Sequence, residues 1–249
     1  MNPSDISNAL IYGIPVVGYV TLYRSFDFIL ARKTPTAATC TRGDPESFAG
    51  NVAPRHGIHI AVATSHEEHE TALELVRARY RWRGYDVPVS DSHASSDANQ
   101  DGGQEITFIA KEGAVALGTL TLGLDGPKGL LAEATHDGVI DAARARGRKV
   151  CELTRLAIAQ SANSKSILSS LLAAAHLVGR EIYAVTDVFI EVNPRHVGFY
   201  SRLLGFVVAA GEKVCERVRA PSVLLRLELD ALEERLARMD VGPLMAKAA

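Results

Sequence analysis

From Ile58 onward, apolar and polar positions follow a pattern that predicts strands and helices in turn. The run "IHIAVAT" is apolar and rich in β-branched residues, which indicates a buried strand. The next segment, "EEHETALELVRARYRWRG", places apolar residues at helical spacing on one face: Ala72, Leu75, Val76 and Tyr80. A strand followed by an amphipathic helix therefore opens the folded part of the chain.

The same patterns continue to the end of the predicted domain. "EITFIAKEG" and "AVALGTLTLGL" meet at a turn around Gly113 and predict an antiparallel hairpin. A long helix is predicted by a buried stripe at Ile167, Leu168, Leu171, Leu172 and Ala175. The other predicted elements are a short helix in "HDGVIDAARARG", strands at "KVCELTRLAI", "DVFIEVN" and "SVLLRLEL", and a helix at "PRHVGFYSRLLG" with proline at its start.

The order β-α-β-β-α-β-α-β-α-β is typical of an α+β domain, with a mixed central sheet and helices on both faces. We expect this domain to span residues 58–230. Residues 1–57 are interpreted as an apolar arm followed by a linker rich in Thr, Ala, Gly and Pro, and residues 231–249 as a C-terminal helix and tail. The uncharged run from Ala9 to Tyr23 is shorter than the roughly 20 residues that a membrane-spanning helix needs, so we expect no transmembrane segment.

Composition narrows the function classes. An apolar share of 47% is ample for a core, and a formal net charge of −2 argues against a nucleic-acid-binding surface. The three cysteines, Cys40, Cys151 and Cys215, are widely spaced, which argues against a disulfide framework or a metal site. A reducing cytoplasm is the expected location.

One stretch carries a recognisable motif where a strand hands over to a helix. In "VTDVFIEVNPRHVGFYSRLLGF", Asn193 and Pro194 end the strand and begin the helix, Tyr200 follows seven residues after the asparagine, and Gly205 and Phe206 close the helix. This spacing resembles the GCN5-related N-acetyltransferases. The resemblance implies a GNAT-like acyl-CoA N-acyltransferase fold.

Further blocks resemble a narrower family. "CELTRLAI" is similar to the Glu-x-Ser/Thr-Arg signature of the acyl-homoserine-lactone synthases, and the wider set resembles the bacterial long-chain N-acyl amino acid synthases more closely. The blocks lie in the same order and cover roughly residues 58–230. They are "ALELVRARYRWRGY", "DAARARGRKVCELTRLAI", "DVFIEVNPRHVGFYSRLLGF" and "RAPSVLLRLEL".

The resemblance implies amide formation, in which the amine of an amino acid attacks a long-chain acyl thioester on phosphopantetheine. No bound cofactor or metal is expected, because the acyl-phosphopantetheine thioester is a co-substrate. The family places the oxyanion and the pantetheine against free backbone groups of the central strand, which corresponds to Leu156 and Ala157 here. The donor-binding set implied is Thr154, Leu156, Ala157, Ile158, Ser164 and Ser166.

Glu152 is the first candidate for activating the amine, since an unpaired carboxylate on a central strand would be costly. A structural ion pair with Arg155 is an equal alternative. Strand alternation places Glu152 and Arg155 on opposite faces, so the two meet only if a bulge intervenes, and the superfamily typically has one there. Arg155 is otherwise expected to bind the carboxylate of the acceptor.

Two residues of the second motif are further catalytic candidates. Tyr200 resembles the general acid that protonates the leaving sulfur, and the alternative is a core tyrosine beside Phe199. His196 lies in the first turn of its helix, where the dipole favours the neutral base form, and the alternative is a capping or packing histidine.

The acceptor is expected to contact Arg79, Arg83 and Asn193, although arginines in "RARYRWRG" are also typical of a solvated helix end. The stretch "AIAQSANSKSIL" contains no glycine, whereas coenzyme A pyrophosphate sites use glycine-rich turns. We therefore expect an acyl carrier protein as donor and partner, with Lys165 and Arg195 as candidate docking residues.

Two other readings stay open at this point. One is a synthase of the acyl-homoserine-lactone type, although the early tryptophan and paired aspartates of that group are not evident after Tyr85. The other is a non-catalytic module that holds an acyl chain in the same cleft. Formation of an amide with release of free thiol separates an enzyme from such a module.

Overall fold

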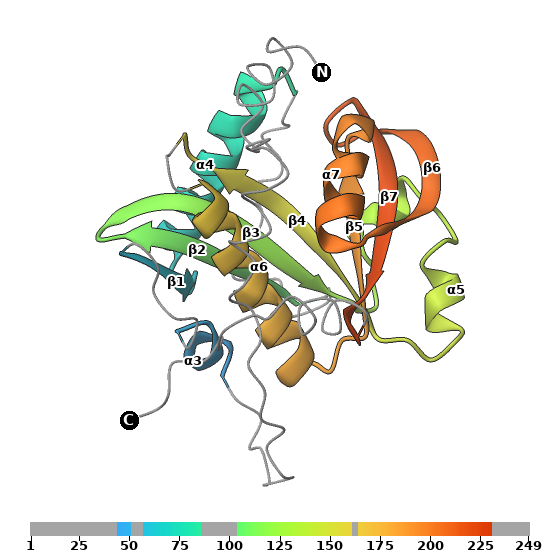
Figure 1. The fold of residues 1–249 in the computed structure, drawn as a ribbon, viewed down its shortest axis with the longest axis horizontal. Coiled ribbons are helices and arrows are strands. Elements are labelled where there is room, and N and C mark those ends of the chain that lie inside the picture. Colours follow the sequence, from blue (N-terminus) through green and yellow to red (C-terminus); the bar gives the residue numbers. More distant parts are fainter. Residues whose placement is uncertain (1–43, 51–56, 86–103, 161–163, 231–249) are drawn as a thin grey trace, which may run out of the picture.

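The structure is a computed structural model, and it describes residues 44–50, 57–85, 104–160 and 164–230. These residues form one mixed seven-stranded sheet with helices on both faces, which confirms the predicted α+β class (Figure 1). The elements are α3 (Pro45–Gly50), β1 (Ile58–Val62), α4 (His66–Trp82), β2 (Glu105–Glu112), β3 (Val115–Leu124), η2 (Leu131–Ala134), α5 (Asp141–Arg144), β4 (Val150–Ile158), α6 (Ser164–Glu181), β5 (Asp187–Val192), α7 (Pro194–Leu204), β6 (Val207–Cys215) and β7 (Ala220–Glu228).

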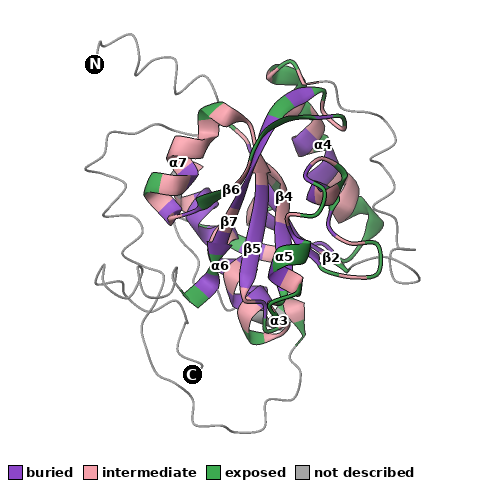
Figure 2. Cartoon of the chain, turned by 90° about the vertical axis from the view of Figure 1, so that its right-hand side faces the viewer, coloured by how far each residue is buried: buried purple, intermediate pink, exposed green. Residues whose placement is uncertain are grey.

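The strands lie in the order β1-β2-β3-β4-β5-β7-β6. Only the β4–β5 pair is parallel among these strands, and every other neighbouring pair is antiparallel. Side chains of alternate residues on one strand enter different cores. Val188 and Ile190 pack with residues of α6 and α7, while Phe189 packs with residues of η2 and α5 on the opposite face. Strand β5 is therefore buried along most of its length (Figure 2).

Local sequence signals set several element ends. Ser65 and Glu68 form a capping box at the start of α4. Asn193 caps α7, Pro194 follows at the first helical position, and Gly205 ends the helix in the left-handed conformation at φ 85°. The handover from β5 to α7 therefore has the geometry that the Asn-Pro and Gly-Phe pairs predict.

The sequence patterns left out some elements and overextended another. They missed β6, because this strand lies at the sheet edge, exposes Val207, Val208 and Val214, and carries two register irregularities that break the alternation. The short helix predicted between His136 and Gly147 is confined to Asp141–Arg144.

A helix lies inside the segment interpreted as a linker. Helix α3 packs on β1 and α6, and Ala49 is fully buried in the main core. The described part of this segment therefore belongs to the folded core. The apolar arm, most of the long polar loop before β2, and the predicted C-terminal helix of residues 231–249 lie outside the described residues.

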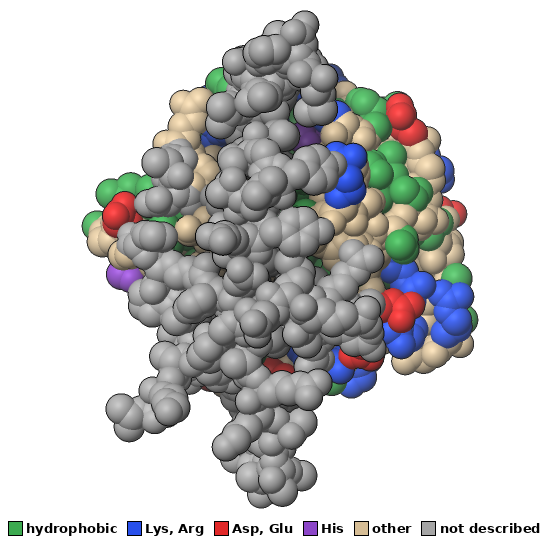
Figure 3. Space-filling model, in the orientation of Figure 1, with side chains coloured by type: hydrophobic (Ala, Val, Ile, Leu, Met, Phe, Trp, Pro, Cys, Tyr) green, Lys and Arg blue, Asp and Glu red, His purple; other side chains and the backbone are tan. Residues whose placement is uncertain are grey.

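On the face shown in Figure 3, the described residues include charged side chains of both signs. In Figure 3, basic and acidic side chains lie next to one another at the lower right of the molecule. Among the described residues, no helix is both long enough and apolar enough to cross a membrane.

Candidate active site

The sheet opens between its two parallel strands. Strands β4 and β5 pair only from Val150 to Glu152 on one side and from Asp187 to Phe189 on the other. Beyond these residues β4 continues to Ile158 and β5 to Val192 without mutual pairing, so the strands splay apart. Along this gap the N–H and C=O groups of β4 that face β5 have no hydrogen bonds to β5, so a ligand can bind to them.

A bulge in β4 lies beside the gap, as the resemblance predicted. Thr119 pairs with Ala157 and Thr121 with Thr154, so β4 has one residue more than β3 between these two pairs. Arg155 takes a positive φ of 51° there, a conformation that costs energy for a residue with a side chain. The bulge turns the Arg155 side chain out of the regular alternation.

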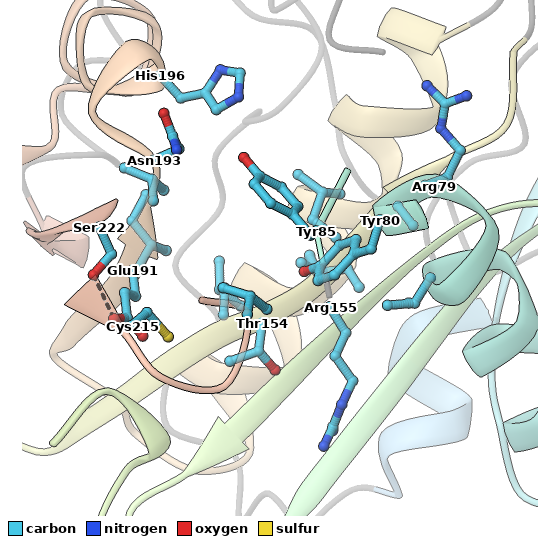
Figure 4. A pocket seen from close by; sticks show the side chains of 18 of the residues that line it. Arg79, Tyr80, Tyr85, Thr154, Arg155, Glu191, Asn193, His196, Cys215 and Ser222 are labelled. Atoms are coloured by element: carbon cyan, nitrogen blue, oxygen red, sulfur yellow. Dashed lines mark hydrogen bonds between the residues drawn. The ribbon is translucent and has the colours of Figure 1, made fainter. Parts of the chain in front are cut away.

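A cavity of about 260 Å³ lies at the splay. Its walls come from α4, from β4 and β5, from the start of α7 and from the turn between β6 and β7 (Figure 4). Tyr80, Tyr85 and Thr154 lie at its centre in this view, with Glu191 and Ser222 on one side. Most of the residues proposed from sequence line this cavity: Arg79, Arg83, Glu152, Thr154, Arg155, Leu156, Ala157, Ile158, Asn193, His196 and Tyr200.

Glu152 is a buried carboxylate at the floor of the cavity, with 3% of its surface exposed. Its Oε1 accepts the backbone N–H of Leu131 at 2.7 Å, and its Oε2 accepts that of Ala132 at 3.1 Å. Burial raises the pKa of Glu152 although both hydrogen bonds lower it. Glu152 thus holds the first turn of η2 in place, and its burial disfavours the charged form of the carboxylate.

The alternative of an ion pair between Glu152 and Arg155 is wrong. Arg155 Nη1 donates to Glu105 Oε2 at 2.6 Å, and the guanidinium points away from Tyr80 and Tyr85 in Figure 4. The bulge does bring Arg155 to the face of Glu152, because Glu105 and Glu152 both pair with Gly123, but the guanidinium pairs with Glu105 instead. Its ion pair with Glu105 leaves Arg155 less suited to bind the acceptor carboxylate.

His196 lies next to Arg83 at the cavity wall. The Arg83 Nη1 group donates to His196 Nε2 at 3.3 Å when the imidazole is neutral at that nitrogen. Burial and then the charges of Arg83 and Arg195 lower the pKa of His196 to about 4. The imidazole is therefore neutral at pH 7, as expected, but its Nε2 lone pair already accepts a hydrogen bond.

Tyr200 is buried on α7 and lines the cavity. Burial and the neighbouring Tyr80 raise its pKa to about 12, so the phenol keeps its proton at neutral pH. Its ring makes edge-on contacts with Phe199 and Phe206, with centroids 5.3 and 5.9 Å apart. The side chain has the packing of a core tyrosine, and a role of its hydroxyl as a proton donor stays a prediction.

Asn193 has structural contacts at the cavity rim. Its Oδ1 accepts the backbone N–H of Arg195 at 3.3 Å, and its Nδ2 donates to the carbonyl of Pro221 at 3.2 Å. These two bonds cap α7 and tie it to β7. A role for Asn193 in acceptor binding stays a prediction.

The residues proposed for the donor divide into two groups. Thr154, Leu156, Ala157 and Ile158 line the cavity along β4, and Thr154 Oγ1 is buried without a hydrogen-bond partner among the described residues. Ser164 and Ser166 lie in the first turn of α6 and are not among the residues that line the cavity. Residues 161–163, which lead into that turn, lie outside the described residues.

Arg79 stacks on Trp82, with its guanidinium carbon 4.7 Å from the ring centre. Its Nη2 is buried without a partner among the described residues, and burial lowers its pKa. In Figure 4 the guanidinium lies away from the central tyrosines. Arg79 therefore borders the cavity, and contact with a substrate stays a prediction.

Sequence reasoning missed several polar residues of the cavity wall. They are Glu191 on β5, Cys215 and Arg217 near the turn between β6 and β7, and Ser222 on β7. Glu191 and Ser222 lie on strands that the patterns predicted, but no motif marks them. Cys215 belongs to the missed strand β6, and Arg217 lies in a charged turn that looks solvated. The described residues hold no group of three or more His, Cys, Asp or Glu side chains that could bind a metal ion.

The splayed parallel strands, the bulge and the cavity define an N-acyltransferase of the GCN5-related type. A family model described as N-acyl amino acid synthase FeeM matches residues 71–228, more than half of the chain. The chain belongs to the FeeM family of N-acyl amino acid synthases and is an acyltransferase.

Solved structures agree with this assignment. The chain is similar to FeeM, an N-acyl amino acid synthase from uncultured soil microbes, with 26% identity and a TM-score of 0.65, covering 76% of this chain and 99% of that one. It also resembles a point mutant of the SpeG spermidine N-acetyltransferase from Vibrio cholerae, with 12% identity and a TM-score of 0.50, covering 73% and 99% of the two chains. The second likeness concerns the fold alone. No curated protein matches the chain.

Proposed function

We propose that the protein transfers a long-chain fatty acyl group from the phosphopantetheine arm of an acyl carrier protein to the amine of an amino acid. The observation that carries the proposal is the cavity at the β4–β5 splay, where a buried carboxylate and a buried phenol line the same space. Membership of the synthase family gives the type of product, an N-acyl amino acid.

The reaction uses each group for one step. Glu152, with its raised pKa, takes a proton from the ammonium of the acceptor, directly or through a water molecule. The free amine attacks the thioester carbon, so a C–N bond forms and the oxyanion develops next to the backbone of Leu156 and Ala157. The C–S bond then breaks, and the Tyr200 hydroxyl gives its proton to the leaving thiolate. The second proton of the attacking nitrogen passes through water to the Tyr200 oxygen, which leaves a neutral amide and restores the phenol.

The apolar side chains of the cavity suit a fatty acyl chain. Leu153, Leu172 and Phe206 line both the main cavity and a smaller apolar cavity of about 50 Å³ between α6 and the sheet. These shared walls offer apolar surface that continues from the splay toward the core, and burying each CH₂ group there stabilises binding by about 0.8 kcal/mol.

The donor proposal rests on the start of α6. Residues Ala157–Leu168 contain no glycine, so a glycine-lined cradle for the coenzyme A pyrophosphate is not available there. A carrier protein presents the same pantetheine arm with one phosphodiester and an acidic surface. Arg195 is exposed, and its Nη2 donates to the hydroxyl of Tyr85, a cavity residue, at 2.6 Å, so its charge lies near the cavity and suits such a surface. The side chain of Lys165 lies outside the described positions.

The location proposed for this reaction is the cytoplasm. Cys151 and Cys215 are free and buried, which is compatible with a reducing compartment.

The test compares palmitoyl carrier protein with palmitoyl-coenzyme A, each with a mixture of the common amino acids. We expect an amide product and release of one thiol per turnover, with the higher kcat/KM for the carrier protein and a steep fall as salt rises from about 20 to about 200 mM, because salt screens docking charges. Arg195→Gln is expected to weaken the carrier-protein reaction, and Arg146→Gln, an exposed arginine near α5, serves as the control.

Two results would count against the proposal. If neither donor gives an amide, the synthase assignment of the site fails and an acyl-binding module becomes the better description. If the coenzyme A ester has the higher kcat/KM, the carrier protein is not the preferred donor.

A further inference from the structure

Two carboxylates lie in one row across three strands of the sheet. Glu105 on β2 and Glu152 on β4 both pair with Gly123 on β3, the strand between them. Residues that pair directly across antiparallel strands point to the same face, so both carboxylates lie on the face where Gly123 has no side chain. The transfer steps above give Glu105 no role.

The missing side chain of Gly123 leaves room for Glu152. A Cβ atom at residue 123 would lie 3.1 Å from Glu152 Cγ and 3.4 Å from Glu152 Oε1. The Glu152 side chain therefore lies over Gly123, on the side of β4 that faces β2 and Glu105. No side chain of β3 separates the two carboxylates at this row, so the charge of one acts on the other.

Arg155 balances the charge of the outer carboxylate. Arg155 Nη1 donates to Glu105 Oε2 at 2.6 Å, and the two side chains are 19% and 27% exposed. Glu152 is only 3% exposed, so the charged groups of the pair are more solvated than the carboxylate beside them. A negative and a positive charge are thus fixed together next to a buried carboxylate.

The conformation of Arg155 costs more than such a contact returns. Its φ of 51° lies in the left-handed region, which is strained for a residue with a side chain. A partly exposed ion pair contributes little to stability. Stability alone therefore does not explain the pair, and Glu152 is the group of the site on which the pair can act.

The ionisation of Glu152 responds to charges around it. Burial is the first cause that raises its pKa, the charge of Glu105 raises it further, and the charge of Arg217 lowers it. Other titratable groups on the elements around Glu152 are Glu133, Cys151, Tyr80, Tyr200, Asp187 and Glu191. All of these stay unchanged when only Glu105 and Arg155 are varied.

We propose that Glu105 and Arg155 are positioning residues that together set the pH at which Glu152 ionises, acting on it across Gly123. Glu105 favours the protonated form of Glu152, and Arg155 holds Glu105 and offsets its charge. This inference rests on the proposed function, in which Glu152 must be ionised to take a proton from the amine.

The first test measures the pKa of Glu152 without catalysis. Carbon NMR of the side-chain carboxyl groups is recorded against pH, and the Glu152 signal is the one missing from Glu152→Gln. Glu105→Gln is expected to lower the pKa of Glu152 by about half a unit or more, and Arg155→Gln to raise it by a similar amount. The double variant should lie near the wild type, because both charges are gone.

Matched variants separate this effect from loss of a surface ion pair. Arg155→Lys keeps the charge and should titrate like the wild type. Lys111 and Glu68 form a control pair with the same 2.6 Å separation and with 25% and 27% exposure, and neither residue lines the cavity. Lys111→Gln and Glu68→Gln should leave the pKa of Glu152 unchanged. If Arg155→Gln does not fold, the fall in Glu105→Gln decides the matter, since a purely structural pair predicts none.

The second test follows kcat/KM with palmitoyl carrier protein against pH. The acid limb of each variant should move in the same direction and by the same amount as the NMR pKa. Shifts of Glu152 below about 0.2 unit in both single variants, or shifts of both in one direction, overturn the inference. If the NMR shifts are opposite but the wild type transfers no acyl group, the electrostatic coupling stands and the proposed function fails. If acyl transfer occurs without these shifts, the proposed function stands and the inference fails.

Discussion

Replacing Glu152 by Gln tests the central chemical assignment of the site. The change removes one negative charge and keeps the size of the side chain. Gln retains one oxygen, so it can accept only one of the two N–H groups that Glu152 binds, from Leu131 and Ala132. The other N–H then faces an amide NH₂ in a buried place.

The cost in stability can be worked from this geometry. One buried donor left without a partner costs about 1 to 3 kcal/mol. Burying a neutral amide costs less free energy than burying the carboxylate whose pKa is raised by burial, and this partly offsets the lost hydrogen bond. The net loss of unfolding free energy is therefore expected at the lower end of this range. A loss of about 1 kcal/mol corresponds to a fall in Tm of about 2 to 4 °C for a domain of this size.

The cost in activity is expected to be much larger. If Glu152 takes the proton from the amine, Glu152→Gln lowers turnover about 100-fold or more. The base must be deprotonated to work, so kcat/KM of the wild type should fall as pH drops through a value above the ordinary 4.5 of a glutamate. The variant should lack this acid limb.

The assay follows thiol release from palmitoyl carrier protein between about pH 5 and pH 9, with thermal unfolding of the same samples. Glu133→Gln is the matched control, because Glu133 accepts the N–H of Leu130 at 2.8 Å in the same turn but does not line the cavity. Glu133→Gln should lose stability and keep its turnover. Turnover of Glu152→Gln within about threefold of the wild type, with the acid limb intact, would refute the role of Glu152 as the base.

The remaining predictions concern a proton donor and a surface carboxylate. Tyr200→Phe keeps the ring packing against Phe206, so turnover should fall by about 10-fold or more with Tm within about 2 °C, and equal activity would make Tyr200 a packing residue alone. The pKa of Glu68 is lowered to about 2, first by its bond from Lys111 at 2.6 Å, so its stabilisation is present above pH 4.5 and is lost as pH falls toward 2. Glu68→Gln should therefore cost about 1 to 2 kcal/mol in urea unfolding at pH 7, after allowance for partial exposure, and little at about pH 2.5, and an equal cost at both values would contradict this.

The part of the fold that depends on local signals was predictable from sequence. Helix α7 begins and ends where Asn193, Pro194 and Gly205 predict, because caps and proline act on their own neighbours. Strand β6 was not predictable, because an exposed edge strand with bulges has no alternating pattern to detect.

The candidate site divides in the same way. The positions of Glu152 and Tyr200 on the cavity follow from motifs within their own strand and helix. The hydrogen-bond partners of Glu152 and Arg155 do not follow from the sequence. Arg155 pairs with a carboxylate 50 residues earlier in the chain. Glu152 binds backbone N–H groups, which every residue except proline has, so the sequence does not reveal them. Arg217 lies in a turn rich in charged residues, where the sequence alone favours a solvated side chain.

The parting of β4 and β5 after three residue pairs also determines what an entering molecule must disrupt. The closed end of the gap is secured by the fully buried Asp187, which accepts from Arg148 and, at 2.7 Å, from Arg226. At the open end no ladder hydrogen bonds join the two strands, so a ligand enters the sheet without breaking backbone pairing. The free-energy cost of ligand entry then comes from displacing water and moving side chains. The hydrogen bonds of the rest of the sheet stay in place while substrates enter and leave.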